Sequence, residues 1–385
     1  MLIKRKLMQR LQDTASGFPV LTITGPRQSG KSTLAKISFP DYKYLTLEDP
    51  DIREFAINDP RQFIRENPEY TIIDEFQKAP QLTSYLQGHI DAVNKPGMYI
   101  LTGSNQFEYI GQVTQSLAGR TAIFRLLPFD YREIYQIEDK DVYEIMVKGF
   151  YPRIFDQNLD FNLFYSSYFD TYIQRDVRSL QHIRDLMVFQ NFVKLCAGRT
   201  GQLLNLSSLS TEVGITHKTI KDWLSILQAS YIIDLLPSYH KNFNKRILKS
   251  PKLYFLDTGL VCYLLGINNA QQLRTHPLRG EIFETFIFSE LIKSRFHNGK
   301  RSNLSFFRDS NGKEIDFIAE TGDGIKAIEV KLNATPGKKM FQNLHYFAEL
   351  ANDLKKSYLI YNGIEHSTRY NATLLGYSDI EKIEL

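Results

Sequence analysis

The sequence predicts an α/β protein in which a parallel sheet with flanking helices is followed by a mainly helical region and by a second α/β domain. Three observations support this order. Short apolar strands recur through the first third of the chain, and the run at residues 20–24 leads into a glycine-containing loop and a helix-like segment. The apolar spacing turns helical between residues 141 and 201. Strand-like runs return after a predicted helix at residues 280–293.

The length and composition indicate a globular protein with several domains. A chain of 385 residues is too long for one hydrophobic core, while 43% hydrophobic and 23% charged residues are ordinary values. Cys196 and Cys262 lack metal-type spacing, which predicts reduced core thiols in a cytoplasmic protein. No segment has the character of a signal peptide or the length of a membrane span, so we expect no membrane partner. The expected domains are residues 1–140, 141–205, 206–270 and 271–385.

The loop after the first strand spells G-x-x-x-x-G-K-S. Its glycines allow backbone N–H groups to wrap a phosphate chain at a helix N-terminus, where the helix dipole favours an anion. Lys31 is expected to reach the β- and γ-phosphates, and Ser32 to hold Mg²⁺. A chance match in a loop is the alternative, but the strand before it and the helix after it favour binding of a nucleoside triphosphate. The predicted lining is Gly25, Pro26, Arg27, Gln28, Ser29, Gly30, Lys31, Ser32 and Thr33.

A second buried-looking strand, at residues 70–73, ends in two acids. Asp74 would lie beside the Mg²⁺ held by Ser32 and act as a further magnesium ligand. Glu75 is then placed to polarise an attacking water as general base. A solvated pair of acids at a strand end is the alternative. The presence of Glu75 favours hydrolysis of the nucleotide over nucleotide binding alone.

Two further polar positions are candidates in the same domain. The strand at 98–102 runs into a polar tip, where Asn105 would orient the water or contact the γ-phosphate, with Ser104 as second choice. A turn that simply needs Gly, Ser and Asn explains the same residues. Arg120 suits a charge stabiliser supplied to a neighbouring copy's nucleotide, which requires at least a dimer, although a surface salt bridge explains it nearly as well.

The order of these motifs resembles a prokaryotic AAA-type ATPase family in which the ATPase is followed by a C-terminal region of poorly defined function. The resemblance implies a P-loop fold with an additional strand, ATP as the nucleotide, and oligomerisation. No second sensor arginine is recognisable in the sequence. The first-domain blocks that carry the resemblance are Gly25–Ser32, Leu47–Pro50, Asp59–Pro60, Ile73–Pro80, Leu101–Ser104 and Leu117–Arg120. The later blocks are Tyr172–Asp176, Tyr254–Leu260 and Gly280–Glu284.

Residues 206–236 predict a helix–turn–helix. A short helix breaks at Gly214, and a second helix follows at 216–227. Strand-like runs at 231–236 and 252–256 would form a wing, and the second helix of such a module can enter a DNA major groove. The predicted buried stripe of the second helix is Ile215, Ile220, Trp223, Leu224 and Leu227, and its outward side is Thr216, His217, Lys218 and Lys221.

The predicted wing is strongly basic, although the net charge of the whole chain is only +4. Residues 236–255 contain no acid but carry Lys241, Lys245, Arg246, Lys249 and Lys252, interleaved with Tyr239 and Phe243. This clustering favours contact with a phosphate backbone. An oligomer interface or a packing unit is the alternative. The candidate DNA-binding residues are Lys218, Lys221, Lys241, Lys245 and Arg246.

The tail carries an acid and then acid-x-lysine on adjoining predicted strands. Side chains alternate along a strand, so Glu329 and Lys331 share one face, with Asp316 on the neighbouring strand. Two carboxylates can hold Mg²⁺, and the lysine can steady an attacking water or developing charge. Glu284 on the preceding helix would add an acid. The pattern resembles the D…E-x-K signature of the restriction-endonuclease-like fold, although a surface ion pair also explains Glu329 and Lys331, and related tails can keep the fold without the chemistry.

The sequence therefore predicts an ATPase that uses ATP and Mg²⁺ and is coupled to DNA binding, with DNA cleavage by the tail as a candidate second activity. The main rival is an ATP-dependent switch whose winged-helix and tail regions bind protein partners. A DNA-binding regulator with a vestigial ATPase is disfavoured by Glu75.

Overall fold

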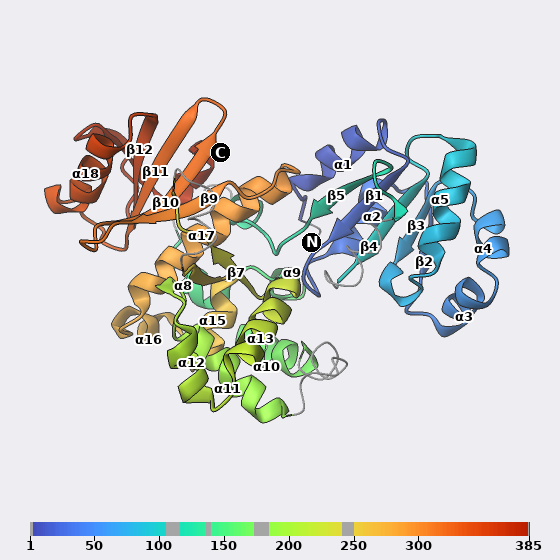
Figure 1. Cartoon of the computed structure of the whole chain (residues 1–385), viewed down its shortest axis with the longest axis horizontal. Helices are drawn as coiled ribbons and strands as arrows, with labels where there is room; N and C mark the ends of the chain where they lie inside the picture. Colours follow the sequence, from blue (N-terminus) through green and yellow to red (C-terminus); the bar gives the residue numbers. More distant parts are fainter. Residues whose placement is uncertain (1–2, 105–115, 136–139, 173–184, 241–249, 384) are drawn as a thin grey trace.

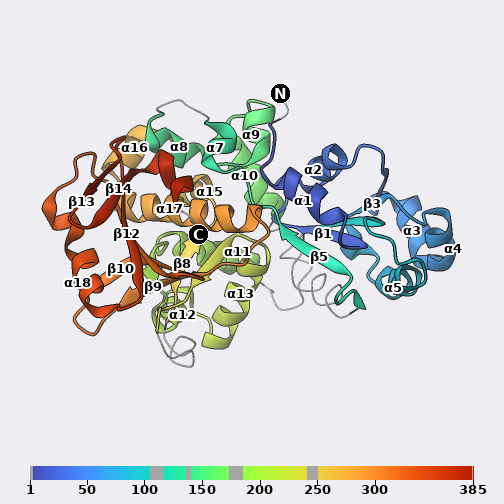
Figure 2. The same ribbon diagram turned by 90° about the horizontal axis from the view of Figure 1, so that it is seen from above.

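The computed structural model describes residues 3–104, 116–135, 140–172, 185–240, 250–383 and 385. Two sheets stand at opposite ends of the molecule, and helices fill the space between them (Figures 1 and 2). Among the described residues, no helix combines the length and apolar character needed to cross a bilayer.

The first domain is built on a parallel five-stranded sheet with the strand order β2-β3-β4-β1-β5, which confirms the predicted parallel sheet. Its strands are β1 Val20–Thr24, β2 Lys43–Thr46, β3 Thr71–Asp74, β4 Tyr99–Gly103 and β5 Thr121–Arg125. Its helices are α1 Leu7–Ala15, α2 Lys31–Ser38, α3 Pro50–Asn58, α4 Pro60–Glu66, η1 Phe76–Lys78 and α5 Leu82–Val93.

Two apolar layers enclose this sheet. Alternate residues of each strand point to opposite faces, so Val20 and Leu101 pack with α3 to α5, whereas Ile23 and Ile100 pack with α1 and α2. The loops that follow the carboxyl ends of the strands are thereby gathered at one edge of the sheet, where ligands of open α/β sheets bind.

The middle of the chain is helical, as predicted, with a small three-stranded sheet of order β6-β8-β7. Two helices lie on either side of Gly214, where the helix–turn–helix is predicted, and an antiparallel pair of strands follows them; the winged-helix assignment itself stays a prediction. The elements before the pair of helices are α7 Tyr131–Ile134, α8 Val142–Lys148, α9 Pro152–Asp156, α10 Phe161–Tyr172, α11 Leu186–Ala197 and β6 Gln202–Leu203. The others are α12 Leu206–Val213, α13 His217–Ala229, β7 Ile233–Leu236, β8 Lys252–Phe255, α15 Thr258–Leu264 and α16 Ala270–Thr275.

The tail contains a six-stranded mixed sheet of order β13-β14-β12-β11-β10-β9. The long helix α17 covers one face, and α18 covers the other. The tail elements are α17 Arg279–His297, β9 Leu304–Arg308, β10 Glu314–Thr321, β11 Gly324–Lys331, η3 Lys338–Phe341, α18 Gln342–Leu350, β12 Leu354–Tyr361, β13 Ser367–Arg369, β14 Ala372–Gly376 and η4 Tyr377–Lys382.

The middle and the tail share one hydrophobic core. Buried side chains from Leu127 to Ile383 form a single continuous cluster, and α17 contributes more than half a dozen of them, including Phe283, Phe286 and Ile287. The chain after β7 also continues beside the tail sheet, because the amide of Tyr239 donates to the carbonyl of Phe306 in β9. The middle segment and the tail are therefore packed against each other as one unit.

Candidate functional site

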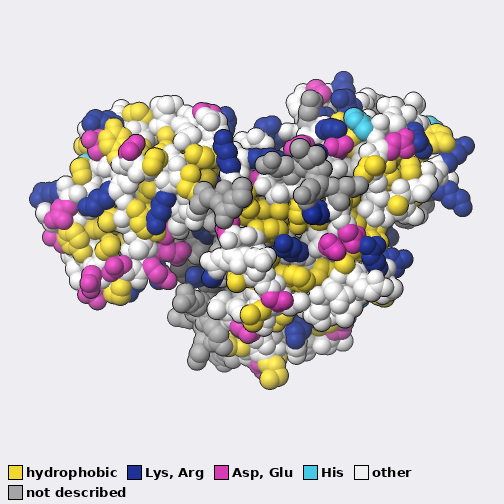
Figure 3. Space-filling model, turned by 180° about the vertical axis from the view of Figure 1, so that it is seen from behind, with side chains coloured by type: hydrophobic (Ala, Val, Ile, Leu, Met, Phe, Trp, Pro, Cys, Tyr) yellow, Lys and Arg dark blue, Asp and Glu magenta, His cyan; other side chains and the backbone are white. Residues whose placement is uncertain are grey.

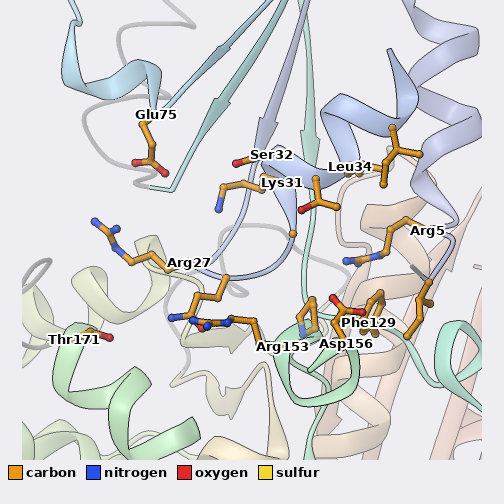
Figure 4. Close-up of a pocket in the computed structure, with 16 residues that line it drawn as sticks. Arg5, Arg27, Lys31, Ser32, Leu34, Glu75, Phe129, Arg153, Asp156 and Thr171 are labelled. Carbon is orange, nitrogen blue, oxygen red and sulfur yellow. The ribbon is translucent and has the colours of Figure 1, made fainter. Parts of the chain in front are cut away.

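A cavity of about 540 Å³ lies at the carboxyl edge of the first sheet (Figure 4). The P-loop forms one wall, and α9 and α10 of the middle segment form the opposite wall. Its lining combines an apolar part with four cations and two acids. The apolar residues include Ile3, Leu34, Ile37, Phe129 and Pro152; the charged residues are Arg5, Arg27, Lys31, Glu75, Arg153 and Asp156; Gln28, Gly30, Ser32, Thr33 and Thr171 complete it.

The loop before α2 has the geometry of a phosphate cradle. Gly25 runs so close to β5 that a Cβ there would collide with the carbonyl oxygen of Leu126, and Gly30 caps α2 with a left-handed φ of 91°. The first N–H groups of α2 have no partner within the helix and point at the cavity edge. The ammonium of Lys31 donates to the carbonyls of Gly25 at 3.1 Å and Pro26 at 2.8 Å. The predicted loop residues are therefore brought together around one anion-binding helix end.

Asp74 lies beside Ser32, as expected for two magnesium ligands. The Ser32 hydroxyl is 2.9 and 2.8 Å from the two carboxylate oxygens of Asp74, and the Tyr44 hydroxyl donates to the same group at 2.7 Å. Thr102 adds a third hydroxyl contact. The three hydroxyls fix the orientation of a carboxylate that is 6% exposed. This donor set fits a hard divalent cation, which takes oxygen ligands.

Glu75 projects from the tip of β3 toward the same cavity, near Lys31 and Arg27 in Figure 4. Its backbone adopts a left-handed φ of 54°, which turns the side chain away from the strand direction. The Gln77 amide donates to Oε2 of Glu75 at 2.6 Å and to Ser104 at 3.3 Å. Ser104, the second-choice polar tip, thus supports Glu75 through Gln77. Asn105 lies outside the described residues.

The tail residues predicted to form a metal site do converge. The ammonium of Lys331 is 2.8 Å from Glu329 and 3.7 Å from Asp316, and the amide of Val330 donates to Asp316 at 2.7 Å. Asn343 of α18 donates to Glu329 at 3.2 Å. The register of β10 against β9 shifts between Ile315 and Ile318, and such an irregularity re-aims a side chain. Asp316 is thereby turned toward β11.

The acids of this cluster have perturbed pKa values. Burial, followed by the nearby charge of Asp316, raises the pKa of Glu284 to about 7 and that of Glu329 to about 8. The pKa of Lys331 is also raised: burial opposes the charge, but Asp316 and Glu329 outweigh it. No three of these acids bring their ligand atoms within 4.8 Å of one another. Among the described residues, the set whose ligand atoms all lie within 4.8 Å is Asp130, Glu133 and His297 instead.

The predicted basic wing needs a correction at Lys252. Its side chain is 4% exposed and forms ion pairs with Glu284 at 3.0 Å and with Glu314 at 2.5 Å, so it faces the tail and not a phosphate backbone. Tyr239 is also buried, against Phe347 of α18. Lys218 and Lys221 are exposed on α13, as predicted. Lys241, Lys245, Arg246, Lys249 and Phe243 lie outside the described residues.

Three protein families match three successive regions of the chain. Residues 17–135 match a family described as an AAA domain. Residues 17–135 form a P-loop domain of the AAA type. Residues 139–271 and 279–378 match two families that are each described as a domain of unknown function. The match to the AAA domain covers the P-loop and the acids at the end of β3.

The relatives extend over most of the chain. Uncharacterized proteins of Mycobacterium tuberculosis and Mycobacterium bovis are each 27% identical over 342 residues, 87% of this chain and 76% of theirs. An uncharacterized protein of Haemophilus influenzae is 22% identical over 363 residues, 84% of this chain and 85% of its own. A solved Walker-type ATPase of Pyrococcus abyssi covers 68% of this chain and 96% of its own, with 14% identity and a TM-score of 0.46.

Arg120 does not reach the nucleotide cavity of its own AAA domain. It precedes β5, so it stands at the amino edge of the parallel strands, whereas the P-loop stands at the carboxyl edge. Its guanidinium pairs with Asp91 of α5, with Nη2 at 2.8 Å from a carboxylate oxygen. The ion pair with Asp91 is the contact that the salt-bridge alternative expects, and a role of Arg120 at the nucleotide of a neighbouring copy stays a prediction.

Two arginines of the cavity were missed by the sequence analysis. Arg5, 7% exposed, donates to the P-loop carbonyl of Ser29 at 2.9 Å and pairs with Glu133 at 3.1 Å. Arg153 opens the middle segment's α9, directly after Pro152, whose Cγ stands 3.9 Å from where a Cβ on Gly30 would be. Neither arginine lies in a motif. The Pro-Arg start of a helix was the only local signal.

The cluster of Asp130, Glu133 and His297 is neutralised by the protein itself. Lys6 lies 3.2 Å from Asp130, and Arg5 pairs with Glu133. Burial disfavours the charged form of Asp130, but the hydrogen bond and charge of His297 outweigh it and lower the pKa of Asp130. Two cations already match two carboxylates, so this cluster ties the N-terminus to α17 and does not need a metal ion.

Proposed function

We propose that the protein is an Mg²⁺-dependent ATPase whose AAA domain acts on the middle and tail segments. The observation that carries this proposal is the convergence of Lys31, the Ser32–Asp74 pair and Glu75 on one cavity. The cavity has a cationic side for phosphates and an apolar side, lined by Ile37 and Phe129, for a base.

Each of these site residues has a defined part in the proposed reaction. Lys31 and the first-turn amides of α2 bind the phosphates, and Ser32 with Asp74 would hold Mg²⁺, which supplies charge neutralisation at the phosphates. Glu75, oriented by Gln77, accepts a proton from the attacking water at its carboxylate. The wall formed by α9 and α10 limits the access of bulk water to this side of the cavity.

Arg153 is the proposed reader of the terminal phosphate. It lines the cavity from the middle segment, and its one hydrogen bond to a described residue is a 3.3 Å contact with Gln157 of its own helical turn. A guanidinium in this place would pair with phosphate oxygens and draw α9 toward the P-loop. It supplies the sensor position that the sequence left unassigned.

Three contacts support coupling of the AAA domain to the rest of the chain. Arg5 joins the P-loop to Glu133. His297, at the end of α17, stands 3.6 Å from Asp130 in the same cluster. The 19 residues of α17 span about 28 Å, and Glu284, near its other end, belongs to the tail cluster. One rigid helix thus connects the surroundings of the P-loop with the tail acids.

DNA is the proposed partner of the rear segments. Lys218 and Lys221 stand exposed near the start of α13, and the buried stripe of that helix is formed by Ile220, Trp223, Leu224 and Leu227 as predicted. The face in Figure 3 carries Lys and Arg side chains mixed with acids over both end lobes, so binding would depend on local clusters and not on overall charge. The tail would add metal-dependent cleavage through Asp316, Glu329, Lys331 and Glu284.

An ATP-dependent switch for protein partners is the second candidate. It is favoured by the ion pairs of Lys331 and Lys252, which already partner Glu329 and Glu284 without a metal ion. Under this proposal the tail keeps its fold as a binding platform, and Asp316→Ala and Glu329→Ala leave ATP turnover and DNA unchanged.

One experiment separates the two proposals. ATP hydrolysis is measured for wild type, Lys31→Ala and Glu75→Gln, with and without plasmid and single-stranded DNA, in Mg²⁺ and then in Mn²⁺. The same DNA is then run on a gel. Turnover that DNA stimulates, with cleavage lost in Glu329→Ala, supports the coupled nuclease. Turnover that ignores DNA and leaves the plasmid intact favours the protein-partner switch, and no turnover in wild type removes the ATPase proposal.

A further inference from the structure

We infer that Lys252 closes the cation site of the tail, because its ammonium and a divalent cation compete for Glu284. The inference builds on the proposed metal site of the tail but not on cleavage of DNA. Lys252 belongs to β8, the last strand of the preceding segment, so the tail cluster is completed by a neighbouring module.

The contacts of Lys252 are those of an internal counter-ion. Its ammonium lies 3.0 Å from Glu284 and 2.5 Å from Glu314, and 3.4 Å from the Tyr254 hydroxyl, which also hydrogen-bonds to Glu284. The side chain is 4% exposed, so solvent hardly screens these contacts. An ammonium bound in this way occupies the carboxylate oxygen that a cation would need.

The rest of the cluster still has capacity for a cation. Glu329 is only 1% exposed, and its Oε2 atom is buried without a hydrogen-bond partner. Four carboxylates, from Glu284, Glu314, Asp316 and Glu329, face three cations: the two ammonium groups and the guanidinium of Arg308, which lies 3.2 Å from Glu314. A buried carboxylate oxygen without a partner is costly, and a divalent cation would satisfy it.

The position of β8 connects this site to the AAA domain. β8 pairs with β7, and β7 begins two residues after Tyr231, whose hydroxyl contacts Thr24 at the end of β1. β8 also packs directly on α17, because its Tyr254 stacks on Phe288 at 4.4 Å. A cavity of about 550 Å³ opens beside Glu284 and Lys331 and gives a cation access to the cluster.

The test is Mn²⁺ binding to the full-length, nucleotide-free protein, followed by electron paramagnetic resonance of free Mn²⁺. Lys252→Met is expected to bind Mn²⁺ at least about tenfold more tightly than wild type, because the competing charge is removed. Lys252→Arg should behave like wild type. Lys313→Met, which removes an exposed lysine next to Glu314, is the matched control and should change nothing. Glu329→Gln in the Lys252→Met background should abolish the gain.

A second variant covers the case in which Lys252→Met does not fold, since that change leaves Glu284 without its cation and Glu314 with Arg308 alone. Lys252→Met/Glu314→Gln removes one charge of each sign and should show the same gain. Equal or weaker Mn²⁺ binding in the folded variant, or no binding in any variant, overturns the inference. Tighter binding without plasmid cleavage would keep the inference and remove the nuclease part of the proposed function.

Discussion

The hydroxyl of Tyr231 lies 2.8 Å from Oγ1 of Thr24, the last residue of β1 before the P-loop. Tyr231 follows α13 directly and has a left-handed φ of 57°, so the backbone is turned where the helix–turn–helix gives way to β7. This hydrogen bond joins the strand that carries the phosphate cradle to the module that carries Lys218 and Lys221. We expect a change at the nucleotide to reach the middle segment through this hydrogen bond.

Tyr231→Phe should uncouple the AAA domain from its partners. The change removes one hydroxyl and keeps the ring in the core, so basal ATP turnover should stay within about twofold of wild type while stimulation by DNA is lost. The fluorescence of Trp223, the single tryptophan, offers a second readout, because it packs on Phe189 and Phe192 close to Tyr231 along the chain. A Trp223 signal that responds to ATP equally in both proteins would contradict this role of Tyr231.

Glu75→Gln should separate binding from hydrolysis. The amide keeps the shape of the side chain but cannot accept the proton, so turnover should fall about a hundredfold or more while ATP affinity is retained. Fluorescent-nucleotide titration and phosphate release measure the two effects. Glu69→Gln, outside the cavity, is the matched control. Residual turnover near the wild-type rate would assign the base to another group.

Arg153→Ala should weaken ATP binding by about tenfold or more and leave ADP binding nearly unchanged, because only ATP offers a terminal phosphate to the guanidinium. Isothermal titration of both nucleotides gives the ratio. Arg65→Ala, an exposed arginine on α4, is the control. Equal losses for ATP and ADP would place Arg153 elsewhere on the nucleotide.

Lys218→Ala/Lys221→Ala should weaken DNA binding to all sequences alike. Each lost phosphate contact should also lower the slope of log K against log salt by about one. Fluorescence anisotropy at several salt concentrations measures both quantities. Lys355→Ala/Lys356→Ala, an exposed pair on β12, is the control. An unchanged slope would favour a protein-binding role for α13.

The tail acids predict a pH dependence of stability. The pKa values of Glu284 and Glu329 are raised in the folded protein to about 7 and about 8, above the ordinary 4.5, first by burial and then by Asp316. The folded state therefore binds more protons than the unfolded chain, so the stabilising contribution is full below about pH 4.5 and is lost as the pH rises through 7 to 8. In metal-free buffer, Tm should fall between pH 5.5 and 8.5, and less so for Glu329→Gln than for the exposed control Glu349→Gln. Parallel profiles for all three proteins would argue against raised pKa values in this cluster.

The local pattern of apolar and polar residues was sufficient to predict several strands and the central residues of the proposed nucleotide site. The apolar runs predicted β1, β3 and β4 to within a residue or two, and the alternation along β11 placed Glu329 and Lys331 beside Asp316. The convergence of Ser32 with Asp74 was predictable because parallel strands present their carboxyl ends at one edge.

The sequence by itself determined the P-loop with the acids at the end of β3, and the proximity of Asp316, Glu329 and Lys331, because each depends on spacing within one strand–loop–helix unit or on neighbouring strands. The tertiary structure decided the rest. Arg5 and Arg153 enter the cavity, and Lys252 enters the tail cluster, from segments far away in the chain, so no local spacing marks them. Basic residues close together in sequence were equally compatible with a DNA-binding wing, and only packing against Glu284 and Glu314 showed that Lys252 is buried. The role of a charged side chain depends on the groups that it contacts. Groups that are far apart in the sequence are brought together only by the folded core.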